Sequence, residues 1–257
     1  MDGAPSPTPP MPTAPVAIVT GASSGIGEAT ARRLAKEGHR VVLAARREER
    51  LNELRSEIEN DGGSALVVPT DVTDREAVKA LAERAKSEYG RIDVLVNNAG
   101  IMPLTFLHNM RTDDWYQTLD VNLYGVLHAV EAVLPTMIEQ ESGHVVNVSS
   151  TAGRRVYPGG AVYSATKFGV RALSEGMRQE LGPRYGIRVT CIEPGAVSTE
   201  LTETIGDEEV QEVMGKMFES LTPLEPERIA EAIAYAVAAP ESATAAEILV
   251  LPTSQER

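Results

Sequence analysis

Short apolar runs alternate with longer amphipathic stretches from Val16 to the end of the chain. The apolar runs, rich in Val, Ile and Leu, occupy 16–20, 41–45, 65–70, 92–98, 144–150, 187–194 and 247–251. Near-continuous apolar runs of this length are typical of parallel strands that are buried on both faces. The pattern therefore predicts seven strands in one parallel sheet.

The stretches between these runs carry apolar residues at helical spacing. In 226–240, for example, Ile229, Ile233 and Val237 fall on one face of a helix. Strands that alternate with helices require right-handed crossover connections, which place helices on both faces of the sheet. We therefore expect an α/β fold: a single Rossmann-type domain with a doubly wound, seven-stranded parallel sheet.

The first 15 residues differ from the rest of the chain. They hold six prolines and no Lys or Arg, and proline removes backbone donors and opposes both helix interiors and central strands. We expect 1–15 to be a disordered tail and 16–257 to be the one folded domain.

Composition excludes several classes of protein. Lys and Arg number 24 and Asp and Glu number 37, so the net charge is −13, which argues against general binding to nucleic acid or to an anionic membrane. The single cysteine, Cys191, rules out an internal disulfide and favours a cytoplasmic protein. No apolar stretch approaches 18 residues, so no membrane span is expected.

A glycine-rich segment follows the first predicted strand directly. Gly21, Gly25 and Gly27 give the spacing G-x-x-x-G-x-G between a strand and a helix. In such a loop the glycines permit a tight turn, close approach of a pyrophosphate and close packing of helix on sheet. The helix N-terminus then faces the phosphates. A plain glycine-rich turn is the alternative, but the strand before and the helix after favour a dinucleotide site.

The end of the second predicted strand indicates which dinucleotide is bound. An acidic residue there reads the 2′-hydroxyl of NAD, whereas a basic residue accommodates the 2′-phosphate of NADP. Ala45 is followed by Arg46 and Arg47, with no carboxylate at this point. A guanidinium can donate charge-assisted hydrogen bonds to phosphate, which favours NADP and places the phosphate at Arg46. A solvated arginine pair is the alternative.

Tyr163 and Lys167 are the candidate acid–base residues. They are four residues apart, so a helix places both side chains on one face. A free tyrosine has a pKa near 10, and a neighbouring ammonium is expected to lower that pKa toward the working range. Tyr163 would then exchange a proton with a substrate oxygen while hydride moves to or from the carbon.

Ser150 and Asn122 are the supporting candidates. Ser150 ends an apolar strand, the edge at which ligands bind in open α/β sheets, and its hydroxyl can hold the substrate oxygen. The Asn122 amide could position a water or the Lys167 backbone. The segment around Ser150 reads Val-Ser-Ser-Thr rather than the G-x-S-x-G of a nucleophile elbow, and the four histidines lack metal-ligand spacing, so we expect neither a serine hydrolase nor a metal site.

These motifs together resemble the short-chain dehydrogenase/reductase family. The resemblance rests on the glycine loop, Asp71, the segment 97–100 (Asn-Asn-Ala-Gly), Asn122, Ser150, Tyr163 with Lys167, and Pro194-Gly195. It implies a catalytic tetrad of Asn122, Ser150, Tyr163 and Lys167. It also implies that Lys167 holds the nicotinamide ribose, that Asp71 and Val72 contact adenine, and that the Pro194 segment contacts the nicotinamide carboxamide.

The candidate cofactor-binding residues come from the loops that follow the predicted strands. They are Gly21, Ser23, Ser24, Gly25, Ile26, Gly27, Arg46, Arg47, Asp71, Val72, Asn98, Ala99, Gly100, Tyr163, Lys167, Pro194, Gly195, Val197 and Thr199. The resemblance further implies a homotetramer or homodimer that pairs helices around 111–140 and 160–182, and a substrate lid over about 198–224.

The expected activity is NADPH-dependent transfer of hydride between the nicotinamide and a carbonyl or alcohol of a small molecule. Parts of the sequence look like clavulanic acid dehydrogenase and bacterial 3-hydroxy acid dehydrogenases, but Leu251 replaces the arginine that those relatives carry. Arg154 and Arg155 could bind a substrate carboxylate, so a 3-hydroxy acid dehydrogenase is one alternative. A non-catalytic NADP-binding sensor is another, and an epimerase or dehydratase is a third. Met214, Met217 and Phe218 suggest an apolar pocket wall in the lid, although a plain amphipathic helix explains them equally well.

Overall fold

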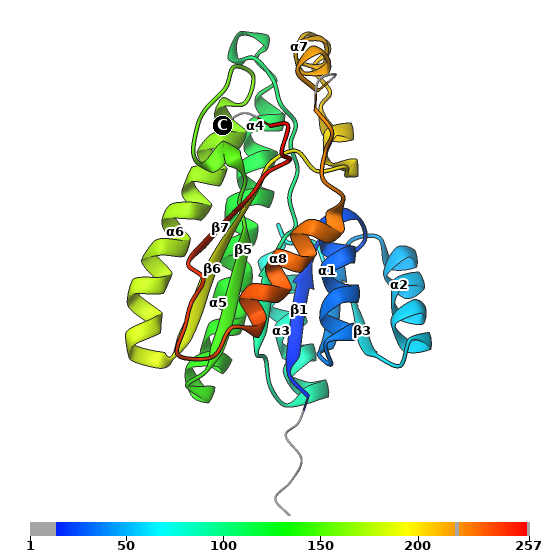
Figure 1. The fold of residues 1–257 in the computed structure, drawn as a ribbon, viewed down its shortest axis with the longest axis vertical. Coiled ribbons are helices and arrows are strands. Elements are labelled where there is room, and N and C mark those ends of the chain that lie inside the picture. The colour runs from blue at the N-terminus through cyan, green and yellow to red at the C-terminus, as the bar shows by residue number, and fades with distance from the viewer. Residues whose placement is uncertain (1–13, 219–220, 256–257) are drawn as a thin grey trace, which may run out of the picture.

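The computed structural model describes residues 14–218 and 221–255, with side chains left undescribed over 214–218. The expected disordered tail thus lies almost wholly outside the described residues, as do the side chains of the predicted lid wall. The described chain forms the predicted seven-stranded parallel sheet, in the order β3-β2-β1-β4-β5-β6-β7. Figure 1 shows α1 and α8 crossing in front of this sheet.

All seven predicted apolar runs form strands, with bounds that differ by a few residues. The strands are β1 (Val16–Thr20), β2 (Arg40–Ala45), β3 (Ser64–Pro69), β4 (Val94–Asn97), β5 (Gly143–Val148), β6 (Ile187–Pro194) and β7 (Glu247–Val250). The chain passes from β3 across the sheet to β4, so the switch in strand order lies between β1 and β4. The loops that leave these two strands therefore open a crevice, where open α/β sheets bind ligands.

Eight α-helices are assigned within the described residues. They are α1 (Gly25–Lys36), α2 (Glu48–Asn60), α3 (Arg75–Tyr89), α4 (Thr112–Leu119), α5 (Gly125–Gln140), α6 (Ala161–Tyr185), α7 (Glu208–Phe218) and α8 (Pro226–Ala238). Short helical turns at Leu107–Asn109, Thr151–Gly153 and Glu200–Thr204 lie in the loops beyond β4, β5 and β6. These turns lie where the site residues are expected.

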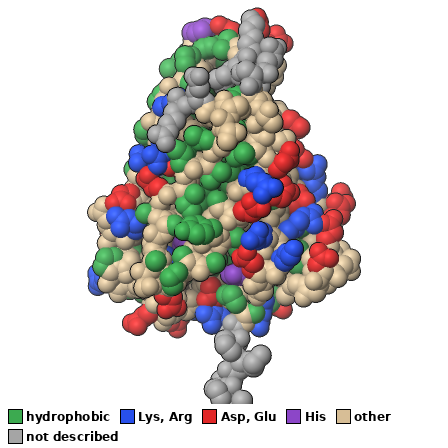
Figure 2. All heavy atoms as spheres, viewed as in Figure 1, with side chains coloured by type: hydrophobic (Ala, Val, Ile, Leu, Met, Phe, Trp, Pro, Cys, Tyr) green, Lys and Arg blue, Asp and Glu red, His purple; other side chains and the backbone are tan. Residues whose placement is uncertain are grey.

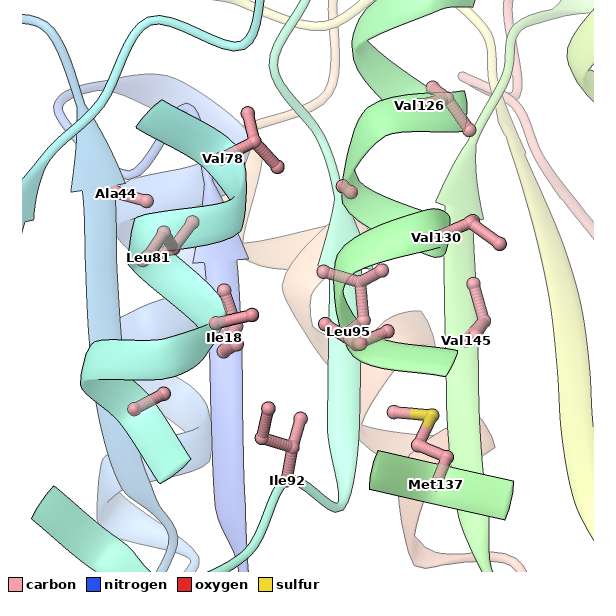
Figure 3. Packing of buried hydrophobic residues seen from close by; sticks show 14 of the residues in the cluster. Ile18, Ala44, Val78, Leu81, Ile92, Leu95, Val126, Val130, Met137 and Val145 are labelled. Atoms are coloured by element: carbon pink, nitrogen blue, oxygen red, sulfur yellow. The ribbon is translucent and has the colours of Figure 1, made fainter. Parts of the chain in front are cut away.

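Two apolar cores cover the two faces of the sheet. Val16 and Ile18 of β1 point into one core, with residues of α3, α5 and α6. Ala17 and Val19 point into the other, with residues of α1, α2 and α8. Figure 3 shows the first core, in which Leu81 of α3 lies against β1 and β2. Because both faces are covered, each strand needs apolar side chains at every position, which explains the continuous apolar runs.

The helix expected around 111–140 is interrupted. A π-helical segment, Asp120–Tyr124, joins α4 to α5, and it contains Asn122. Such one-residue expansions of a helix often occur at functional sites. The run Thr112–Gln140 has the length and apolar composition of a membrane span, yet half of its apolar window is buried inside the fold. Packing on the sheet thus accounts for the buried half of its apolar residues.

Candidate active site

The glycine loop joins β1 to α1 through backbone conformations that favour glycine. Gly21 has φ +66° and Gly25 has φ +53°, values in the left-handed region. A Cβ on Gly27 would overlap the Gly21 carbonyl oxygen. The Ser24 side chain at the start of α1 does not cap the helix, so the first-turn amides are left for a ligand. The uncapped backbone amides, and the space that the glycines leave where side chains would lie, fit a pyrophosphate.

Asn98 and Ala99 hold the loop after β4 against the glycine loop. The Asn98 side-chain amide donates to the carbonyls of Thr20 (3.0 Å) and Gly21 (3.3 Å). The Thr20 hydroxyl accepts from the backbone amides of Asn98 and Ala99 at 3.0 and 3.1 Å. The structure therefore places these two predicted cofactor segments side by side across the crevice, with little freedom to move apart.

Arg47, rather than Arg46, engages the serines of the glycine loop. Its guanidinium donates to Ser23 Oγ at 3.1 Å and to Ser24 Oγ at 2.7 Å. Arg46 instead lies near Asp71, just beyond β3. Against the effect of burial, two hydrogen bonds from Thr73 lower the pKa of the Asp71 carboxyl, and Arg46 lowers it further. Arg47 thus contacts the glycine loop, whereas Arg46 lies near the segment after β3.

Tyr163 and Ser150 meet at the end of β5. The two side chains are hydrogen-bonded to each other, and Ser150 also accepts from the Ala152 amide at 3.1 Å. Lys167 lies one helical turn further along α6, with Nζ 5.8 Å from the centre of the Tyr163 ring. The Lys167 ammonium donates to the Val148 carbonyl at 2.9 Å. Three of the four predicted catalytic side chains are thus brought together.

Burial dominates the protonation of these groups. It raises the pKa of Tyr163 above its ordinary value, and the neighbouring Tyr157 adds to this rise while the Ser150 hydrogen bond opposes it. Burial also lowers the pKa of Lys167 to about 8. The expected lowering of the Tyr163 pKa beside Lys167 is therefore not found in the protein alone, because loss of water around the phenol dominates. Tyr163 is therefore a neutral phenol in this structure.

Asn122 is buried in the π-helical segment, beside the same site. Its side-chain amide donates to the Ile101 carbonyl at 2.9 Å and accepts from the Ile101 amide at 2.9 Å. A Cβ on Gly100 would lie 3.3 Å from Asn122 Oδ1 and 3.9 Å from Lys167 Nζ. Asn122 therefore positions the loop after β4 next to Lys167 rather than binding the Lys167 backbone, whose carbonyl accepts from Ser149.

The segment after β6 closes the crevice. Gly195 donates its amide to the Val250 carbonyl at 2.8 Å, which anchors the Pro194-Gly195 turn to β7. Val197 forms an isolated bridge with Leu224. Thr199 lies over the glycine loop, because a Cβ on Gly25 would be 2.9 Å from Thr199 Cγ2. Val72, at the other end, packs closely on Gly125 at the start of α5.

Arg154, a candidate for binding a substrate carboxylate, is engaged elsewhere. Its guanidinium pairs with Glu193 Oε2 and with Glu247 Oε2, each at 2.5 Å. Glu193 is fully buried in β6, and burial raises its pKa despite the arginine beside it. Releasing Arg154 to a substrate would leave this buried carboxyl short of a partner, which is costly.

Sequence reasoning missed three residues around the site. Glu200 of the predicted lid pairs with Arg47 at 2.8 Å and with Arg50 at 2.5 Å. Asp207 accepts from the Thr105 hydroxyl at 2.6 Å and caps α7. Tyr157 packs in one apolar cluster with Tyr163. Their only sequence signal is position after a predicted strand, which many surface residues share.

Comparison with known proteins agrees with this architecture. A family model described as short chain dehydrogenase matches residues 15–210. An uncharacterized oxidoreductase of Staphylococcus saprophyticus is 46% identical over 241 residues, covering 93% of this chain and 96% of that protein.

Two solved structures extend the likeness to the whole fold. The closed form of serine dehydrogenase complexed with NADP+ has a TM-score of 0.86 at 35% identity, covering 94% of this chain and 96% of that chain. A variant of actinorhodin polyketide ketoreductase with NADPH has a TM-score of 0.83 at 33% identity, covering 93% and 96%. The family model and these relatives establish that the chain is an oxidoreductase of the short-chain dehydrogenase/reductase family.

Proposed function

We propose that this protein is an NADPH-dependent carbonyl reductase that also oxidises the corresponding alcohol. The observation that carries the proposal is the buried, neutral Tyr163, hydrogen-bonded to Ser150 and lying one helical turn from Lys167. A phenol held in this way at the mouth of a dinucleotide crevice can give a proton to a carbonyl oxygen.

NADP is the cofactor that the crevice and the relatives support. Serine dehydrogenase and the actinorhodin ketoreductase are each described with NADP+ or NADPH. In this chain the amides of the glycine loop would hold the pyrophosphate, and Arg47 with Arg46 would take the 2′-phosphate. Arg46 and Arg47, rather than a carboxylate, directly follow β2, which favours a 2′-phosphate over a 2′-hydroxyl.

Each tetrad residue has a distinct task in the proposed reaction. When bound, NADPH supplies the hydride that the carbonyl carbon accepts. Ser150 donates to the carbonyl oxygen and orients it, and Tyr163 gives that oxygen its proton. Lys167 would hold the nicotinamide ribose and, while charged, favour the phenolate that Tyr163 becomes. Asn122 holds the Gly100 loop beside Lys167 through its two bonds to Ile101.

Reduction of a carbonyl panel tests this function directly. Purified protein is mixed with NADPH and with ketones, aldehydes or 3-oxo acids, and the loss of NADPH absorbance is followed. The proposal is supported if NADPH is oxidised only when a carbonyl is present and Tyr163 is intact. Tight NADPH binding without turnover of any carbonyl would instead favour a non-catalytic sensor.

We also propose a cytoplasmic homodimer or homotetramer. Large apolar side chains are exposed on the helices expected to pair: Tyr116 of α4, Tyr124 and Leu127 near the start of α5, and Phe168 of α6. Tyr235 of α8 is 71% exposed, and Figure 2 shows hydrophobic side chains gathered over that face. Exposed apolar patches of this kind favour association, which light scattering of the purified protein would measure.

A further inference from the structure

A cavity of about 600 Å³ lies between the loop after β4 and the loop before α6. Five of its lining residues are Phe106, Leu107, Val156, Tyr157 and Pro158, all of them apolar or aromatic. Its volume falls in the range of ligand pockets, and its outer side is open to solvent, where Leu107 and Val156 are exposed. It is far larger than a short hydroxy acid needs.

The cavity adjoins the proposed proton donor. Tyr157 lines the cavity and also belongs to the buried apolar cluster that contains Tyr163 and Ala152. The two tyrosines are close enough for Tyr157 to raise the pKa of Tyr163. If the carbonyl group of a substrate is held at Tyr163, its substituent would therefore lie beside Tyr157 and extend into the cavity.

The polar groups at the cavity wall have partners among the described residues. The His108 ring stacks on Phe106 with centroids 5.6 Å apart and meets Glu209 at 3.2 Å. The Thr105 hydroxyl donates to Asp207 at 2.6 Å. The described lining includes no Lys, Arg, Asp or Glu. Arg155 lies near Tyr157 but does not line the cavity, so a carboxylate placed here would lose water without a cation in the wall itself.

We propose that this cavity holds an apolar, preferably aromatic, substituent of the carbonyl substrate, and that Phe106 and Tyr157 determine this specificity. The proposal rests on the proposed function and narrows it: the preferred substrates are uncharged aryl or long-chain carbonyls rather than 3-oxo acids. Aromatic side chains suit this task, because ring stacking adds to the free energy of burying apolar surface.

Three carbonyls that share a methyl ketone test the pocket. They are 4-phenylbutan-2-one, butan-2-one as the small neutral control, and 3-oxobutanoate as the acid. Because the phenyl group leaves water, kcat/KM for the aryl ketone should exceed that for butan-2-one by roughly tenfold or more. The acid should be the poorest of the three.

Two variants locate the effect in the cavity. Phe106→Ala should remove most of the aryl preference, mainly through KM, because kcat/KM should fall much further for the aryl ketone than for butan-2-one. Val156→Arg places a cation in the cavity wall at a position that is 63% exposed and tolerant of charge. It should lower kcat/KM for the aryl ketone and raise it for 3-oxobutanoate. Ser56→Arg on α2 adds the same charge away from the cavity and should change neither ratio.

The outcomes separate the pocket from the reaction. If butan-2-one and the aryl ketone are reduced equally well, or if Phe106→Ala slows both to the same extent, the pocket assignment is overturned and the reductase stands. If the protein reduces none of the three carbonyls with NADPH, the proposed function fails and the pocket assignment fails with it.

Discussion

Arg47 and Glu200 form an ion pair at 2.8 Å although 153 residues separate them in the chain. Arg47 simultaneously donates to Ser23 and Ser24 of the glycine loop, while Glu200 begins the helical turn after Thr199. The pair therefore ties the segment after β6 to the glycine loop. The pKa of Glu200 is lowered to about 2 by its hydrogen bonds with Arg50 and Arg47, so this contact persists throughout the ordinary pH range.

This position makes Arg47 the stronger candidate for reading the 2′-phosphate. Arg47→Ala should weaken NADPH binding by roughly 10- to 100-fold, the loss expected for charge-assisted hydrogen bonds. Binding of NADH, which has no 2′-phosphate, should change little. Fluorescence titration with both cofactors measures the two dissociation constants, and Arg46→Ala is the matched control, for which a smaller loss is expected. Equal losses for NADPH and NADH would contradict the assignment.

Tyr163→Phe should remove most carbonyl reduction while NADPH still binds. The change deletes the proton donor without opening the buried site around Ala152, and general acid catalysis is typically worth about 100- to 10,000-fold. Steady-state reduction and NADPH titration of the same preparation check both halves. Tyr157→Phe is the control, because it removes the neighbouring hydroxyl and should keep turnover. Near-normal turnover by Tyr163→Phe would rule out the mechanism.

The pH dependence of reduction should report Lys167. Burial lowers the pKa of this ammonium to about 8, so its positive charge is present below pH 8 and is lost as pH rises through 8. If the charge assists Tyr163, kcat/KM falls above that pH in the free enzyme. Lys167→Arg, whose guanidinium stays charged, should move this fall upward or remove it. An unchanged pH profile in the variant would show that the Lys167 ammonium does not determine the pH dependence of kcat/KM.

Gly27 tests how tightly the glycine loop is packed. A Cβ at this position would overlap the Gly21 carbonyl oxygen, so Gly27→Ala should lower stability and abolish NADPH binding. Gly176→Ala is the matched control in α6, where nothing lies within 4 Å of the added atom. That change should raise stability by about 0.5–1 kcal/mol. Thermal unfolding of both variants with and without NADPH distinguishes them, and NADPH binding retained by Gly27→Ala would contradict the packing argument.

The fold was largely predictable because continuous apolar runs and amphipathic stretches arise from a sheet covered on both faces. Val16 and Ala17 point into opposite cores, so neither position can be polar. The π-helical segment at Asn122 was not predictable, because its cause is a tertiary contact: the paired hydrogen bonds to Ile101.

Within the site, motifs predicted Ser150, Tyr163 and Lys167. These residues could be predicted because Tyr163 and Lys167 lie one turn apart on a single helix and Ser150 ends a strand, so short stretches of sequence contain the signal. Electrostatics was less predictable. The choice between Arg46 and Arg47 depends on where Ser23 and Glu200 lie in three dimensions, and the pKa of Tyr163 depends on its burial. Similarly, the sequence makes Arg154 a candidate for binding a substrate carboxylate, but in the structure its guanidinium pairs with the buried Glu193.

His144 should make the folded protein sensitive to acid. It is 1% exposed in β5, with Nε2 2.8 Å from the Thr190 hydroxyl, and burial lowers its pKa from 6.5 to about 3. Below pH 6.5 this histidine is therefore protonated in the unfolded chain but stays neutral in the folded protein. Stability consequently falls as pH drops from 6.5 toward 3. Between pH 7 and pH 4.5 this group should lower the free energy of unfolding by on the order of 2–3 kcal/mol.

His144→Gln tests this effect. The glutamine keeps a polar partner for Thr190 but does not titrate, so the free energy of unfolding of the variant should decline less over that interval. His108→Gln, at an exposed position, should decline as the parent does. Urea unfolding at several pH values measures these slopes, and parallel slopes for the parent and His144→Gln would show that His144 is not the acid-sensitive group.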